Sequence, residues 1–501
     1  TLRTVIIGAG FAGLSAACYM AREGHEVILL EKNSSLGGRA RQLVRDGFRF
    51  DMGPTFYWMP DLIERFFADF GQKPQDHFTL RRLDPSYEIV FAEGNRIALP
   101  AGEQAVTALF EEIEPGSGKF LRKFLRSAEF NYRTAVEKVI QKPGRSPLEL
   151  VMPETIVRLP QFVRSVAHTI RRGVKDERLR RVLEFPALFL GARPEQTPSF
   201  YRLMNYADMG LGTWHIEGGM AQLVAAMERL ARTLGVEILP DHPVRKILVE
   251  GNHVRGVVTD RGHFEADTVI SSADYRHTER LLPGHLCNYP EMYWHRKVFA
   301  PSAMLFYIGF GRRVKDVSHH TLFFDTSFEE HASMIYDTPG WPEKPLFYAS
   351  FPSVSDPTLC PAGCETAIVL IPAAAGLKEC PGIRDRYFAQ VIDRMERLLG
   401  QRLREYVLFR ESYAASDFIR DYNACHGNAY GLANILSQTA FLRPKVCNRR
   451  LPNLFYTGHL TVPGPGVPTA LVSGKVAASC ALAQLASSNP HKTYSYGSTL
   501  R

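Results

Sequence analysis

The stretch TVIIGAGFAG, residues 4–13, decides the fold of this chain. Four residues with an apolar pattern run directly into the glycines, and residues 14–22 continue with the pattern of a helix. This order predicts a buried strand, a tight turn and a helix whose N-terminus offers free N–H groups to a phosphate. Gly8 permits the turn, Gly10 lets a pyrophosphate approach the backbone, and Gly13 lets the helix pack closely on the strand. The stretch therefore predicts a dinucleotide-binding site.

The residues that follow favour FAD among the dinucleotides. Glu31 ends a second predicted strand, residues 27–30, where a carboxylate accepts hydrogen bonds from ribose hydroxyls and repels the 2′-phosphate of NADP. The next loop holds the GGR sequence, residues 37–39, whose backbone and guanidinium are suited to grip a pyrophosphate from its other side. A nicotinamide dehydrogenase has no need of this second motif. The alternative is a solvated turn with a surface arginine.

Together with FDMGP, residues 50–54, these motifs resemble the amine oxidase and carotenoid desaturase superfamily of flavoproteins. The far end is also similar: NLFYTG, residues 453–458, predicts a strand and a glycine turn, and PGPGVP, residues 463–468, precedes a predicted helix over 469–486. This resembles the closing segment of bacterial-type phytoene desaturases, where the first and last stretches of the chain meet over one FAD. A further similar segment is WHIEGGM, residues 214–220. The candidate FAD-binding residues are Gly8, Gly10, Phe11, Ala12, Gly13, Glu31, Lys32, Gly38, Arg39, Gly53, Pro54, Val244, Gly458, Gly466 and Val467.

The length of 501 residues allows two connected domains, both discontinuous in sequence. We expect an α/β fold in which a Rossmann-like FAD-binding domain joins a substrate domain of mixed sheet and helices. The FAD-binding domain is predicted to comprise residues 1–80, 208–295 and 425–486, and the substrate and membrane-associating domain residues 81–207 and 296–424. The polar residues 487–501 are predicted to form a mobile tail. Further predicted elements are a hairpin over 244–259, strands at 268–272, 302–308, 346–350 and 367–371, and helices over 104–113, 119–140, 221–234 and 383–399.

A basic, periodic segment suggests a membrane surface. The net charge is +8, and eight Arg or Lys lie between Arg158 and Arg181. Apolar residues recur there at spacings of three and four, namely Ile156, Leu159, Val163, Val166 and Ile170. The pattern predicts a basic amphipathic helix that lies in the headgroup layer or packs its apolar face on the core.

Other broad classes are not favoured. No stretch approaches the roughly 20 apolar residues needed to span a bilayer, and no nucleic-acid-binding module is recognisable. The first predicted strand follows Thr1 at once, so we expect no secretory signal and a cytoplasmic protein bound peripherally to the inner membrane. The eight cysteines lack the spacing of a zinc site, which predicts reduced thiols and no metal.

Three reactions compete: amine oxidation, desaturation of a hydrocarbon and redox-neutral isomerisation. Amine oxidases of this superfamily commonly place an aromatic side chain beside the flavin from the closing segment, but residues 462–468 contain none. The segment resembles the desaturase pattern, from which it departs at Val462 and at His459-Leu460. Desaturation delivers a hydride to the flavin and releases a proton that neighbouring double bonds make acidic, so orientation in a dry tunnel can suffice. The helix N-terminus at Gly466-Val467 would stabilise negative charge on the reduced flavin.

No catalytic residue is assigned from the sequence. Asp51, His215 and Glu217 are expected to be structural, whereas the aromatic residues 56–58 are candidates to line an apolar channel. The resemblance implies an FAD-dependent carotenoid desaturase that takes phytoene from the lipid towards lycopene and passes electrons to a quinone or to oxygen. The alternatives are desaturation of a later, hydroxylated carotenoid, carotenoid isomerisation, and non-catalytic binding as in the Rab escort proteins.

Overall fold

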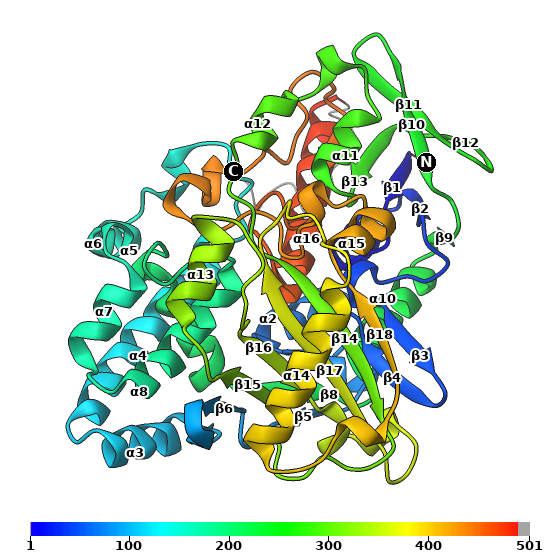
Figure 1. Ribbon diagram of the computed structural model, residues 1–501. Coiled ribbons are helices and arrows are strands. Elements are labelled where there is room, and N and C mark those ends of the chain that lie inside the picture. The colour runs from blue at the N-terminus through cyan, green and yellow to red at the C-terminus, as the bar shows by residue number, and fades with distance from the viewer. Residues whose placement is uncertain (1, 489–501) are drawn as a thin grey trace.

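A five-stranded parallel sheet joins three distant parts of the chain. The computed structural model describes residues 2–488 (Figure 1). The strand order is β19-β13-β1-β2-β9, and all neighbours pair in parallel. The strands are β1 (Arg3–Ile7), β2 (Glu26–Leu30), β9 (Glu237–Leu239), β13 (Thr268–Ser271) and β19 (Leu454–Tyr456). The predicted strand–turn–helix order at the N-terminus is therefore confirmed.

Both faces of this parallel sheet are covered, as its apolar strands require. Three helices pack on one face: α1 (Phe11–Arg22), α10 (Ala221–Thr233) and α16 (Val467–Ser488). The other face meets a three-stranded antiparallel sheet of β10 (Val244–Glu250), β11 (His253–Thr259) and β12 (Gly262–Glu265). The predicted hairpin is the β10–β11 pair.

A seven-stranded mixed sheet forms the second part of the molecule. Its order is β18-β14-β17-β16-β15-β6-β7, in which only the β15–β6 pair is parallel. The strands are β6 (Tyr87–Phe91), β7 (Arg96–Leu99), β14 (Ser302–Phe310), β15 (His320–Phe324), β16 (Phe347–Ser350), β17 (Glu365–Ala373) and β18 (Val407–Tyr413). Helix α14 (Ile383–Leu399) buries apolar residues against one face. The predicted α/β fold with a mixed sheet and helices is confirmed.

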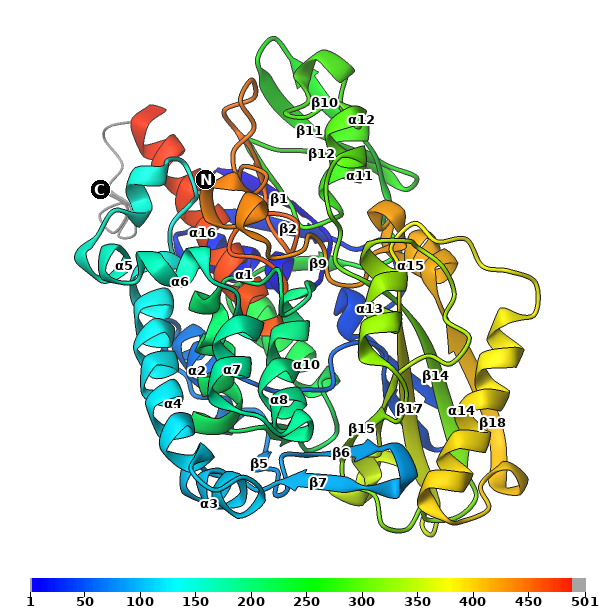
Figure 2. The same cartoon turned by 60° about the vertical axis from the view of Figure 1, so that its left-hand side comes forward.

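A layer of helices lies on the side of the molecule away from α14 (Figure 2). Its members are α3 (Glu103–Ile113), α4 (Ser117–Thr134), α5 (Pro153–Val157), α6 (Leu159–Val163), α7 (Val166–Gly173) and α8 (Glu177–Glu184). Further elements are β3 (Gln42–Arg45), β4 (Phe48–Asp51), β5 (Leu80–Arg82), β8 (Trp214–Ile216), α11 (Tyr275–Arg280), α13 (Phe328–Tyr336) and α15 (Ala415–Tyr422).

The prediction of one basic amphipathic helix around residues 156–170 is wrong. Three short helices replace it, because Pro160 lacks an N–H and restarts the chain as α6, and Ser165 caps α7 by accepting a hydrogen bond from the His168 N–H at 3.1 Å. The apolar residues of this segment therefore differ in their exposure to solvent. Val166 and Ile170 are buried, whereas the earlier ones are exposed.

The structure also differs from two predictions about the C-terminal part of the chain. Residues 487 and 488 belong to α16 rather than to a tail, and residues 489–501 lie outside the described part of the chain. Within residues 2–488, α16 is long and apolar enough to cross a membrane, with a mean hydropathy of 1.3, which the sequence expectation missed. In the fold, however, 61% of that stretch is buried. Its small residues allow close contact with α1, since a Cβ on Gly474 would lie 2.4 Å from the Ala12 carbonyl oxygen.

Candidate active site

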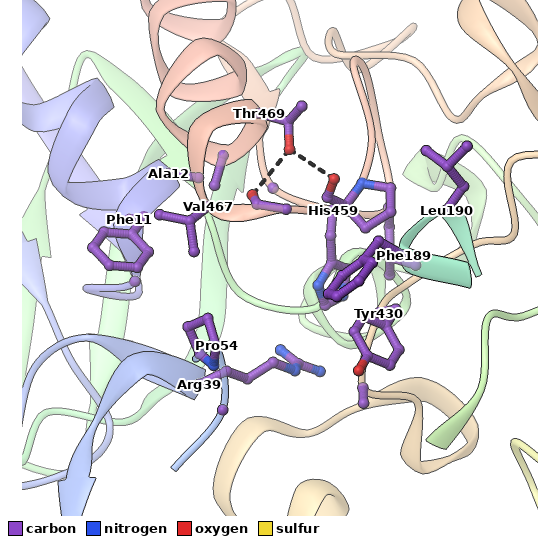
Figure 3. A pocket seen from close by; sticks show the side chains of 18 of the residues that line it. Phe11, Ala12, Arg39, Pro54, Phe189, Leu190, Tyr430, His459, Val467 and Thr469 are labelled. Carbon is purple, nitrogen blue, oxygen red and sulfur yellow. Dashed lines mark hydrogen bonds between the residues drawn. The ribbon is translucent and has the colours of Figure 1, made fainter. Parts of the chain in front are cut away.

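One cavity of about 730 Å³ extends from the first glycine turn to the space between the helical layer and the seven-stranded sheet. At one end it is lined by the turn after β1 and by the start of α16. At the other end aromatic and aliphatic side chains line it, from residues 185–190, from β16 and from α13. Figure 3 shows two of them, Phe189 and Leu190. A polar nucleotide and an apolar chain can therefore share one enclosure.

The first turn is built as the sequence predicts. Gly8 has a φ of +93°, which glycine adopts without strain. A Cβ on Gly13 would lie 1.9 Å from the Gly8 carbonyl oxygen, so this glycine is required for packing inside the protein. A Cβ on Gly10 would meet no protein atom within 4 Å, although Gly10 lines the cavity. A pyrophosphate can therefore approach the protein backbone closely at Gly10.

Glu31 both holds this turn and faces the cavity. Its two carboxylate oxygens accept hydrogen bonds from the N–H groups of Ala9 and Asn33, each at 2.8 Å. The side chain is buried and belongs to the cavity wall. Each carboxylate oxygen can accept a further hydrogen bond, so the predicted contact with ribose hydroxyls is compatible with the structure.

Arg39 supplies a positive charge beside the turn. Its Nη2 donates to the Asn428 carbonyl oxygen at 3.1 Å, and the guanidinium lies 5.0 Å from the centre of the Tyr422 ring. Burial lowers the pKa of Arg39, but an arginine remains charged in proteins. Its Nε is buried without a hydrogen-bond partner. An unpaired buried donor at the cavity fits an anionic group there.

The first turn of α16 lies across the cavity from Arg39 (Figure 3). Gly466 has a φ of +123° and turns the chain into the helix, and the Thr469 hydroxyl donates to the carbonyl oxygens of Pro465 and Gly466 at 2.7 and 2.9 Å. The first N–H groups of a helix have no intrahelical acceptor, and the helix dipole is positive there. The predicted electropositive end of this helix therefore lies in the cavity wall.

The structure brings the predicted cofactor residues together. Fourteen of the fifteen candidates line the cavity, and only Gly13 lies behind it, packed on Gly8 and Ser272. Their contacts with FAD stay a prediction, supported by the open space at Gly10 and the unpaired Arg39 Nε.

The polar candidates of the central segments lie outside the cavity wall. Asp51 accepts a hydrogen bond from the Met220 N–H at 2.9 Å, and burial raises its pKa to about 6. His215 Nε2 lies 2.9 Å from Asp356 Oδ2, and Glu217 pairs with Arg81. These partners agree with the structural roles expected from the sequence.

Aromatic side chains form the apolar wall. Of the predicted aromatic residues, Phe56 and Trp58 line the cavity, whereas Tyr57 points elsewhere because side chains of extended backbone alternate. The centre of the Phe189 ring lies 4.6 Å from that of Trp58 in a tilted contact and 5.1 Å from that of Phe56 in an edge-to-face contact. Sequence reasoning missed Phe189 and Tyr430, which Figure 3 shows on the apolar side of the cavity. The FPALFL run, residues 185–190, was the available signal for the first of them.

The acidic residues that line the cavity form hydrogen bonds with other groups of the protein. Asp274 accepts from the His277 and Cys425 N–H groups at 3.0 and 2.9 Å, and Asp421 bonds to Arg41 and Tyr413. Glu149 accepts from two backbone N–H groups, and Glu31 holds the first turn. Within the described chain, no carboxylate stands free among the aromatic side chains. The cavity is therefore suited to orient an apolar chain rather than to abstract a proton with a strong base.

Two histidines in the wall are neutral. Burial lowers the pKa of His331 to about 4, and its ring nitrogens bond to the Pro372 carbonyl oxygen and the Leu346 N–H at 2.8 and 2.9 Å. Burial also holds the pKa of His459 well below its usual range. Neither ring adds a positive charge to the apolar part of the cavity.

Comparison with known proteins places the chain among flavoproteins. Residues 11–482 match the family of flavin containing amine oxidoreductases. The chain is 38% identical over 487 residues to a carotenoid 3,4-desaturase of Haloarcula japonica, covering 96% of this chain and 98% of that protein. It is 31% identical over 485 residues to a zeta-carotene-forming phytoene desaturase of Myxococcus xanthus, covering 95% and 92%. A 4,4'-diapophytoene desaturase of Staphylococcus haemolyticus is 30% identical over 493 residues, covering 95% and 98%.

Solved structures agree on the fold. A putrescine oxidase variant superimposes with a TM-score of 0.62 at 16% identity, covering 96% of this chain and 99% of the other. A cyclohexylamine oxidase of Brevibacterium oxydans gives a TM-score of 0.56 at 16% identity over the same shares. At this level of identity the likeness supports the architecture alone.

Proposed function

The chain belongs to the carotenoid desaturases within the flavin containing amine oxidoreductase family, and from this premise we propose that it desaturates an acyclic carotenoid held lengthwise in the cavity. It is an FAD-dependent oxidoreductase acting on CH–CH groups. The observation that carries the proposal is the continuity of the cavity, because the predicted FAD contacts and the aromatic wall line the same enclosure.

The chain's own residues would act by binding and orientation. Bound FAD supplies the capacity to accept a hydride from the hydrocarbon. The turn at Gly8 and Gly10, together with Arg39, would hold its pyrophosphate, while the first turn of α16 offers a positive helix end to the flavin. Phe56, Phe189 and their neighbours exclude water and fix the polyene. Orientation of this kind can supply several kcal/mol of rate enhancement, about 7 to 11 in well-aligned reactions.

Two substrates remain candidates within this proposal. The sequence resemblance favours phytoene, converted by successive dehydrogenations towards lycopene, and the Myxococcus and Staphylococcus relatives bear names of phytoene-type desaturases. The 38% identity to a carotenoid 3,4-desaturase favours the alternative from the sequence, desaturation of a later carotenoid at a single bond. An isomerase remains a third, weaker alternative.

Expression in two carotenoid-producing hosts separates these candidates. In cells that accumulate colourless phytoene, a phytoene desaturase gives coloured products with longer conjugation, resolved by chromatography. In cells that accumulate a hydroxylated lycopene derivative, a 3,4-desaturase lengthens the conjugated system by one bond. The control in both hosts is the Gly10→Val variant, which is expected to be inactive. If neither pool changes although the wild-type protein carries FAD, the carotenoid proposal is contradicted.

We also propose that the protein draws its substrate from a membrane surface. Six apolar side chains around α5 and α6 are 60% to 81% exposed, namely Leu148, Val151, Ile156, Val157, Leu159 and Val163. Glu149 and Leu150, which lie between two of them in the sequence, line the cavity. Arg164, which is exposed, adds positive charge beside these side chains. A lipid bilayer would cover this surface and bring an apolar substrate to the cavity.

Removing part of this surface should weaken membrane binding. The double variant Leu159→Ser/Val163→Ser is expected to lower binding to anionic liposomes by roughly thirtyfold, because two side chains each lose on the order of 1 kcal/mol of burial in lipid. Co-sedimentation measures the effect. The matched control is Val44→Ser/Leu408→Ser, which removes apolar side chains that are 61% and 60% exposed at other sites. Equal binding by both double variants would contradict the proposed surface.

The proposal has two further parts. The protein lies at the inner face of the cytoplasmic membrane, and it passes its electrons to a quinone or to oxygen. Both rest on the sequence argument and on the exposed apolar surface, and the same liposome preparation with and without a quinone tests the acceptor. Re-oxidation of the reduced protein only when quinone is present would favour the quinone, and re-oxidation by air alone would favour oxygen.

A further inference from the structure

A second, smaller cavity of about 390 Å³ contains two cysteines. Cys447 precedes β19, where it forms an isolated β-bridge with Phe455, and Cys480 lies in the second half of α16. Arg145 and Arg449 also line the cavity, and none of the described residues that line it is acidic. The sequence gives no sign of this pairing, since the two cysteines have no motif spacing. The fold brings them together through contact between β19 and α16.

The two thiols interact and differ in character. Both line this cavity, and Arg145 Nη2 lies 4.0 Å from Cys480 Sγ. Interaction with the Cys480 thiol and the charge of Arg145 lower the pKa of the Cys447 thiol below its usual range. The same interaction and burial raise the pKa of Cys480. Cys447 is half-buried at the cavity, and Cys480 is 1% exposed.

This arrangement is that of an attacking thiol and a resolving thiol. A thiolate is the nucleophile in thiol–disulfide exchange, and Cys447 is the thiol that the cavity leaves accessible beside the two arginines, so Cys447 is the attacking member. Burial keeps Cys480 protonated and out of reach of solvent until a bond forms next to it. By contrast, burial raises the pKa of Cys18 and of Cys425, which lie elsewhere in the core.

We propose that Cys447 and Cys480 form a redox-active dithiol that is oxidised by a small anionic disulfide of the glutathione class. The Cys447 thiolate attacks one sulfur of the disulfide, forms a mixed disulfide and releases one thiolate. That thiolate takes the proton of Cys480, and the Cys480 sulfur then attacks Cys447 and releases the second thiolate. The protein loses two electrons and two protons, and the small disulfide becomes two thiols. Arg145 and Arg449 attract its carboxylates to the cavity.

The dithiol is separate from the FAD cavity and does not depend on the proposed reaction. The test uses the full-length, FAD-loaded protein incubated with glutathione disulfide, followed by alkylation of free thiols and peptide mapping by mass spectrometry. The expected product is a peptide pair linked through Cys447 and Cys480, which dithiothreitol separates. In the Cys480→Ala variant Cys447 should accumulate as a stable mixed disulfide with glutathione.

Cys380, which is exposed, is the internal reference. Cys447 should react with iodoacetamide at a lower pH than Cys380 does. Arg145→Gln should slow the reaction of Cys447 with glutathione disulfide at neutral pH by roughly threefold, since a smaller fraction is thiolate. The proposal is overturned if Cys447 reacts no faster than Cys380, or if wild-type protein stops at the mixed disulfide with Cys480 still free.

Discussion

Gly10→Val is expected to abolish FAD binding while the fold stays intact. The side chain would meet no protein atom within 4 Å of its Cβ, so it enters only the space in which we place the pyrophosphate. We expect a loss of at least about a hundredfold in affinity, about 2.7 kcal/mol. Flavin absorbance after purification and titration with FAD measure the effect.

The control for this prediction is the neighbouring glycine. Gly13→Ala places a Cβ 1.9 Å from a backbone oxygen, so it should destabilise the protein itself and lower its yield. Gly10→Val should instead unfold at the temperature of wild-type protein stripped of FAD, because it loses only the stabilisation that ligand binding gives. Gly10→Val protein that retains wild-type flavin content would contradict the placement of the cofactor.

Ala332→Phe is expected to stop carotenoid conversion while FAD stays bound. Ala332 is a buried residue of α13 that lines the apolar part of the cavity, away from the glycine turn. A phenyl ring there would fill space that a long substrate needs, so the reacting carbons no longer reach the flavin. A misplacement of about 1 Å can already cost roughly a hundredfold in rate, and we expect at least about a tenfold loss of product.

Chromatography of products from a carotenoid-producing host measures this loss, with flavin content measured on the same protein. Ala332→Ser keeps the size of the side chain and is the matched control. A shorter acyclic substrate should be less affected by the phenylalanine than a longer one. Unchanged conversion of the long substrate by Ala332→Phe would place the polyene elsewhere.

The cofactor half of the site was predictable because its signals are local. The turn at Gly8 and the close packing at Gly13 each follow from the absence of a Cβ, and the strand and helix on either side have clear periodicity. Glu31 was also identified, although its bonds to the N–H groups of Ala9 and Asn33 were not, since they depend on how two loops meet.

The other features of the fold and the site could not be predicted, because they depend on long-range packing or on residues that interrupt a periodic sequence pattern. The spacing of Ile156 to Ile170 is helical, but Pro160 and Ser165 divide the segment, and the exposed half could not be told from the buried half. Phe189 and Tyr430 lie in different parts of the chain and meet only in the folded cavity. The same is true of the Cys447 and Cys480 thiols.

The central claim is that one cavity holds both FAD and an acyclic carotenoid. Its most direct test is anaerobic mixing of FAD-loaded protein with liposomes that contain phytoene or, separately, a hydroxylated lycopene derivative, followed by extraction and chromatography of the carotenoids, because coloured carotenoids mask the absorbance of the flavin. We predict that wild-type protein adds up to one double bond per bound FAD to at least one of the two carotenoids and that Ala332→Phe, equally loaded with FAD, does not. Two unchanged carotenoids, or equal conversion by the variant, would contradict the account.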